Sequence, residues 1–66
     1  MKITVNGEEH SIQDGQTISD LVEGLGFSKK PCAIERNRTV VPRAAHAQTQ
    51  LADGDAIEIV TLVGGG

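Results

Sequence analysis

The side chains that could perform chemistry are few and widely spaced in this chain of 66 residues. Cys32 lies in an apolar, strand-like stretch, which favours a small buried residue over a nucleophile. His10 and His46 lack neighbours at the spacing of a zinc site or of a nucleophile and its base. Asp53 and Asp55 flank a glycine, which is typical of a turn. We therefore expect no catalytic side chain, no metal site and no enzyme activity in this chain.

The remaining reactive group is the carboxylate that follows Gly64, Gly65 and Gly66. These glycines do not predict a phosphate-binding loop, because no helix, Lys or Ser/Thr follows them, and we expect this chain to bind no cofactor. Extended, they span about 10 Å and could enter a narrow slot. With a pKa of about 3.3–3.7, the carboxylate is ionised and can attack a phosphate that an adenylating partner presents. A frayed end or a cloning remnant is the alternative interpretation.

The composition excludes several classes of protein. The net charge of -3 argues against nucleic-acid binding, which usually depends on a basic surface. A single cysteine cannot form an internal disulfide, so we expect a reducing, cytoplasmic location. No apolar run approaches the roughly 20 residues that a membrane-spanning helix needs.

The first half of the chain predicts a hairpin followed by one helix. Apolar residues alternate over residues 1–5, Asn6-Gly7 is a strong two-residue turn signal, and the polar residues 8–12 predict an edge strand. Thr17 can cap a helix, with Asp20 reaching back to it. The expected apolar face of this helix consists of Ile18, Leu21, Val22 and Leu25, and Gly26 is expected in the left-handed conformation after its end.

The second half predicts three strands, around residues 31–37, 39–41 and 56–63. Because the first and last strands are the most apolar, we expect them side by side and parallel at the centre of the sheet. The order ββαβββ then gives an α+β protein with the β-grasp, or ubiquitin-like, fold, in which a mixed sheet of four or five strands packs on one helix. Residues 1–63 form a single domain in this prediction, and residues 64–66 form a flexible arm.

The last strand also predicts a docking surface. If Ile57 and Ile59 face the helix, Val60 and Leu62 point outward beside the glycine arm. Exposed apolar residues next to a functional chain end are typical of a partner-binding site. For the three arginines between residues 36 and 43, we expect a face exposed to solvent and not a partner-binding surface.

The chain resembles the ubiquitin-like sulfur carriers, most closely the thiamin-biosynthetic ThiS family, over essentially its whole length. The matching pieces are "MKITVNGE", "TISDLVEGL", "AIERNRTVVPR", "LADGDAIEIV" and "VGGG", and their order and spacing make the combination specific. His46 departs from the family, in which this position is often aromatic. Gly64 extends the minimal Gly-Gly end by one residue.

The resemblance implies a function for the terminal carboxylate. A ThiF-like enzyme would adenylate Gly66 with ATP and Mg²⁺, and a persulfide made by a cysteine desulfurase would convert it to a thiocarboxylate. The charged carrier would then give its sulfur to thiazole synthase, ThiG, during thiamin biosynthesis.

Other functions remain open at this point. The small subunit of molybdopterin synthase is similar in fold and tail but typically longer, and sulfur carriers of other pathways share the same features. A protein modifier would end with Gly66 joined to a lysine amine. A free-standing β-grasp binding module would not require the Gly-Gly end.

Overall fold

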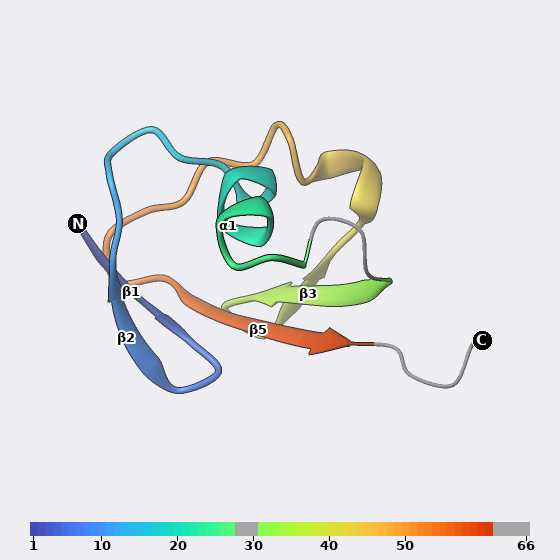
Figure 1. Ribbon diagram of the computed structural model, residues 1–66, viewed down its shortest axis with the longest axis horizontal. Helices are drawn as coiled ribbons and strands as arrows, with labels where there is room; N and C mark the ends of the chain where they lie inside the picture. The colour runs from blue at the N-terminus through green and yellow to red at the C-terminus, as the bar shows by residue number, and fades with distance from the viewer. Residues whose placement is uncertain (28–30, 62–66) are drawn as a thin grey trace.

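The computed structural model describes residues 1–27 and 31–61 (Figure 1). The expectations for residues 28–30 and 62–66, including Leu62 and the glycine arm, lie outside these ranges. The described elements are β1 (Lys2–Val5), β2 (Glu8–Ser11), α1 (Ile18–Gly24), β3 (Cys32–Arg36), β4 (Thr39–Val41), the 3₁₀ helix η1 (Arg43–Ala45) and β5 (Ala56–Thr61). The predicted order of strands and helix is therefore confirmed.

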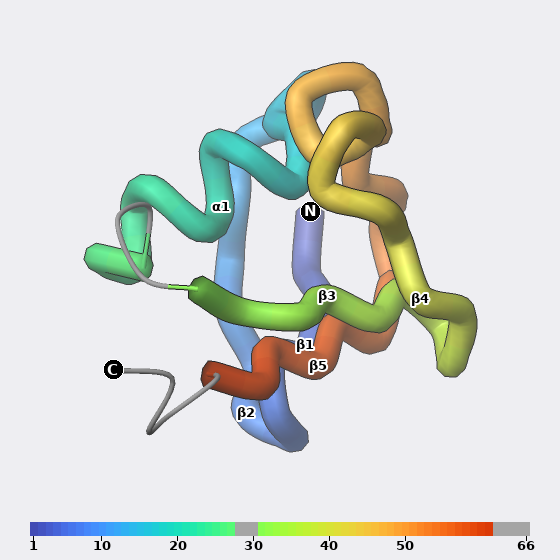
Figure 2. Tube along the Cα trace, turned by 90° about the vertical axis from the view of Figure 1, so that its right-hand side faces the viewer, coloured from blue at the N-terminus to red at the C-terminus, as the bar shows by residue number. Residues whose placement is uncertain are grey.

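The strands form one mixed, five-stranded sheet in the order β2-β1-β5-β3-β4. β1 and β5 run parallel, with Thr4 opposite Ala56 and Val5 opposite Ile57, and the other neighbours are antiparallel. The two most apolar strands are thus adjacent, as predicted, with β5 in the middle. Figures 1 and 2 show α1 and the segment that follows β4 on the same side of this sheet.

Both hairpins turn through residues with positive φ. Asn6 (51°) and Gly7 (85°) join β1 to β2, and Asn37 (52°) and Arg38 (69°) join β3 to β4. Two consecutive left-handed residues give the turn whose twist matches that of the flanking strands. Arg38 adopts this conformation at a cost of roughly 1–2 kcal/mol, because its Cβ approaches the following carbonyl oxygen.

The helix begins at a reciprocal cap, as predicted. The Asp20 N–H donates to Thr17 Oγ1 (3.2 Å), and the Thr17 N–H donates to Asp20 Oδ2 (2.9 Å). Gly26, with a φ of 83°, follows the C-cap Leu25. A helix of seven residues is marginal in isolation, so contacts with the sheet must supply most of its stability.

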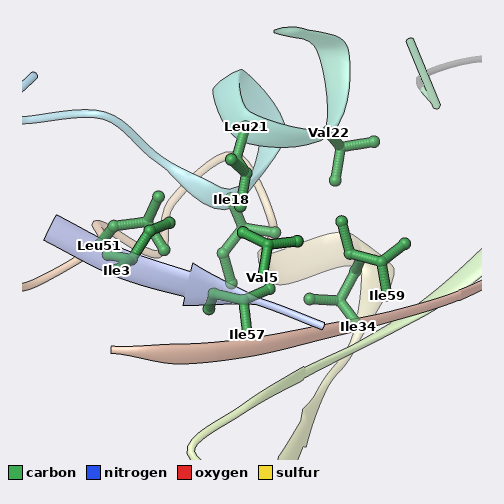
Figure 3. Packing of buried hydrophobic residues seen from close by; sticks show 9 residues of the cluster. All are labelled: Ile3, Val5, Ile18, Leu21, Val22, Ile34, Leu51, Ile57 and Ile59. Atoms are coloured by element: carbon green, nitrogen blue, oxygen red, sulfur yellow. The ribbon is translucent and has the colours of Figure 1, made fainter. Parts of the chain in front are cut away.

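The core lies between α1 and the sheet (Figure 3). Three helical residues of the predicted apolar face are buried, and Leu25 is partly buried. The buried cluster consists of Ile3, Val5, Ile18, Leu21, Val22, Ile34, Leu51, Ile57 and Ile59. Within the described residues, no helix covers the opposite face of the sheet.

The segment between β4 and β5 is hydrogen-bonded to the start of α1. The N–H groups of Ile18 and Ser19 donate to the carbonyls of Thr49 and His46, at 3.0 and 3.1 Å. His46 is 9% exposed, and its Nε2 lies 2.9 Å from the Val41 carbonyl oxygen. The His46 ring therefore lies inside the fold with a backbone partner.

The Asp55 side chain links the end of β3 to the segment before β5 through hydrogen bonds. Its Oδ2 accepts hydrogen bonds from Arg36 Nε and the Ala52 N–H, both at 2.8 Å, and its Oδ1 accepts one from Asn37 Nδ2 at 3.0 Å. Burial raises the pKa of Asp55, but these hydrogen bonds and the charge of Arg36 outweigh it and bring the pKa below its ordinary value of 3.8. Arg36 is thus half-buried and paired, which corrects the expectation of a solvated face.

We predict that Asp55→Asn lowers the free energy of unfolding by about 2 kcal/mol at pH 7, because Arg36 loses its charged acceptor. The native pKa lies below the unfolded one, so Asp55 contributes stability above roughly pH 4 that is lost as the pH falls through the native pKa. The difference between variant and wild type should therefore shrink towards pH 3 in urea titrations followed by circular dichroism. Asp14→Asn, at a side chain that is 92% exposed, is the control and should change little. A pH-independent difference for Asp55→Asn would contradict this assignment.

Candidate functional site

β5 is the element that leads towards the predicted glycine arm. Ile57 and Ile59 are 1% and 6% exposed and face the helix, whereas Val60 is 51% exposed on the other face. This alternation agrees with the sequence-based assignment of the two faces of the strand. Leu62 lies outside the described residues, and the docking role of both side chains stays a prediction.

The side chain of Asn6 extends the sheet beyond the end of β1. The Ile59 N–H donates to Asn6 Oδ1 at 2.8 Å, and Asn6 Nδ2 donates to the Ile59 carbonyl at 3.2 Å. The Asn6 N–H donates to the Ile57 carbonyl at 2.9 Å. Asn6 therefore forms part of the hairpin turn, and its side chain makes the hydrogen bonds to β5 that a further residue of β1 would otherwise make.

β3 pairs with the other edge of β5 from Ile57 to its last residue. The antiparallel register runs from Arg36 opposite Ile57 to Cys32 opposite Thr61, the last residue of β5. Together with the Asn6 contact, this pairing fixes the position and direction in which the described chain ends. The sequence pattern predicted both hairpins, but it assigned Asn6 to the turn alone and so missed its bonds to Ile59.

The candidate catalytic residues are placed in two regions. Cys32 and His46 are among the residues that line an open pocket of about 250 Å³, to which α1, β3 and η1 contribute. Cys32 is partly buried at the edge of the core, not fully buried as the sequence predicted. His10 lies on β2 opposite Ile3, at the far edge of the sheet.

These residues do not form a catalytic or metal-binding arrangement in residues 1–27 and 31–61. No hydrogen bond there joins Cys32 to His46, whose Nε2 is directed to Val41. The same residues contain no group of three His, Cys, Asp or Glu side chains that could hold a metal ion. Within them, no helix has the length and apolar character needed to cross a membrane.

The chain matches the ThiS family over residues 2–66. It is 33% identical to the sulfur carrier protein ThiS of Escherichia coli, with all of both chains covered. It is also 44% identical to a thiazole synthase of Magnetococcus marinus, over all of this chain but only 20% of the longer protein. The crystal structure of the thiamine biosynthesis protein ThiS from Geobacter metallireducens superposes with a TM-score of 0.80, at 33% identity and full coverage of both chains.

We predict that Asn6→Ala lowers the free energy of unfolding by about 1–2 kcal/mol, because it removes two hydrogen bonds and places a less tolerant residue at positive φ. Hydrogen exchange measured by NMR should show faster exchange of the Ile59 amide. Asn6→Asp keeps the acceptor for this amide but loses the donor to the carbonyl, so it should retain more protection. Unchanged exchange in Asn6→Ala would mean that the side chain does not hold this strand.

Proposed function

The chain belongs to the ThiS family, and on this premise we propose that it is a sulfur carrier of thiamin biosynthesis, a protein co-substrate of partner enzymes and not itself an enzyme. The observation that carries the proposal is the match with the Escherichia coli carrier, which covers all of both chains. The similarity to the Geobacter structure also covers all of both chains and supports the same proposal. The chemistry is assigned to the carboxylate of Gly66.

In the proposed first step, a carboxylate oxygen of Gly66 attacks the α-phosphorus of ATP in a ThiF-like enzyme. Pyrophosphate leaves, and the carboxylate becomes a mixed anhydride with AMP. Mg²⁺ belongs to this partner, where it neutralises charge on the phosphates. The carrier contributes the nucleophile and the glycines that deliver it.

In the second step, the terminal sulfur of a persulfide, made by a cysteine desulfurase, attacks the carbonyl carbon and displaces AMP. A thiol then cleaves the sulfur–sulfur bond and is oxidised to a disulfide, which leaves a thiocarboxylate on Gly66. The thiocarboxylate then gives its sulfur to the carbonyl substrate bound by a thiazole synthase, and the carbonyl oxygen that the sulfur replaces returns to Gly66 and restores the carboxylate. We place these steps in the cytoplasm, where the thiol of Cys32 would stay reduced.

The assignment of thiazole synthase as the acceptor rests on the longer relative. A protein named thiazole synthase contains a stretch that is 44% identical to this chain, which occupies one fifth of its length. A carrier and an acceptor that react with each other gain effective concentration when they are joined. Such a fusion therefore favours a direct reaction between the two.

The anchoring of β5 suits a carrier. Residues that do no chemistry can still accelerate a reaction by holding the reacting group in position. Asn6 and β3 hold β5 up to Thr61, so the last described residue before the arm has a fixed position on the domain. Residues 64–66 have no Cβ, and they can enter a channel too narrow for larger residues.

We predict that incubation with a ThiF-like enzyme, ATP, Mg²⁺ and a persulfide source replaces one oxygen of Gly66 by sulfur. Intact-mass spectrometry would detect the corresponding increase in mass. Removal of Gly66 should abolish the change and leave the thermal midpoint nearly the same. An unmodified wild-type chain in the presence of a partner that charges its own carrier would refute the proposal, and an amide-linked conjugate would indicate a protein modifier.

We also predict that Val60→Asp folds like the wild type, because this side chain is 51% exposed on the uncovered face. It should nevertheless slow adenylation several-fold, since a charge would replace an apolar contact beside the arm. Pyrophosphate release gives the rate. Ser11→Asp adds the same charge on the exposed edge strand β2 and serves as control. Equal rates for Val60→Asp and the wild type would exclude a docking role for Val60.

A further inference from the structure

The uncovered face of the sheet carries two carboxylates directly opposite each other. Glu35 on β3 and Glu58 on β5 are register partners in the antiparallel ladder. Like charges in this position destabilise a sheet. The ion pairs of the described residues join other groups, so neither carboxylate has a cationic partner there.

Apolar side chains flank this pair. Val40 on the edge strand β4 is opposite Glu35 and is 64% exposed, and Val60 is opposite Ala33 and is 51% exposed. We call these residues on three adjacent strands the carboxylate face: Ala33, Glu35, Val40, Glu58 and Val60. The two valines are the large hydrophobic residues most exposed in the described chain, and they lie beside unpaired negative charge.

We infer that the carboxylate face docks onto a cationic, partly apolar surface of the adenylating enzyme, with a Lys or Arg placed between the two glutamates. This inference rests on the proposed function, and it adds the chemistry by which the partner is recognised. A cation at this position would turn a repulsive pair into an attractive cluster. The valines would then pack against apolar side chains around it.

Other occupants fit the charge less well. A second copy of this chain would place glutamates against glutamates, and nucleic acids and acidic membranes would be repelled in the same way. An enzyme that binds ATP gathers cationic groups around the phosphates. Because Val60 is one residue from the end of β5, an enzyme that accepts the chain end must come close to this face.

The position of the charges also predicts how they act. Glu58 is exposed and Glu35 is half-buried, so their attraction to a partner is screened by salt. Charges at the rim of an interface chiefly change the rate of association and its salt dependence. We therefore expect an effect on the affinity for the enzyme and on KM, with kcat unchanged.

The test compares two double variants with the same net charge. Glu35→Gln with Glu58→Gln removes the pair, and Glu8→Gln with Glu23→Gln removes two exposed carboxylates elsewhere. Binding to the ThiF-like enzyme of the same organism is measured by calorimetry without ATP, at low and high salt. We expect the first variant to bind about tenfold more weakly at low salt, to lose most of its salt dependence and to keep an equal or higher thermal midpoint. We expect the control to bind like the wild type.

Two outcomes would overturn the inference. One is equal binding of both double variants, and the other is a lowered thermal midpoint for the first, which would make the pair structural. Because binding is measured without ATP, the result does not depend on sulfur loading of Gly66. A wild-type chain that binds but is never loaded would refute the proposed function and leave the docking surface standing.

Discussion

One helix of seven residues, helped by the segment between β4 and β5, must shield one face of a five-stranded sheet from water, and most features of this protein follow from that constraint. A helix this short covers only the middle of the sheet, so the largest fully buried side chains are four isoleucines on the helix and on three central strands. The other face has to be acceptable to water, which explains why the residues of β5 alternate between isoleucine and exposed side chains. In the described residues, the face that no helix covers therefore carries exposed side chains such as Val60.

Short strands create a second difficulty, because each leaves backbone groups without a ladder partner. Here polar side chains provide the missing hydrogen bonds. Asn6 Oδ1 accepts one from the Ile59 N–H, and Asn37 Oδ1 accepts one from the Ala56 N–H. Asp55 Oδ2 accepts one from the Ala52 N–H. Each of these residues lies in a turn or at the end of an element. The turns of this protein are therefore part of the sheet's stability as well as its connections.

The elements that could be predicted from the sequence are those set by local chemistry. The Asn6-Gly7 turn, the Thr17 cap and the alternation along residues 56–61 each depend on near neighbours, and the structure has all three. The apolar character of β1 and β5 also predicted their parallel pairing, but the contacts of individual polar side chains with residues far along the chain could not be predicted. Arg36 meets Asp55 only after β3 pairs with β5, and His46 is buried because the long segment before β5 folds back on the start of α1. The attack of the Gly66 carboxylate on a phosphate could be proposed from the residues themselves, but the sulfur chemistry came from the resemblance, since the residues alone left an inert glycine end as an alternative.

The parallel pairing of β1 and β5 has a mechanical consequence. β1 starts at the first residues of the chain and β5 runs in the same direction towards the last ones, so a pull on the two ends slides the strands past each other. The hydrogen bonds from the N–H groups of Thr4 and Asn6, at 2.9 Å each, and those between Asn6 and Ile59 would then bear the load together instead of opening one after another. Shear of this kind resists force better than peeling. We therefore expect the domain to stay folded when a force acts between its first strand and its last strand.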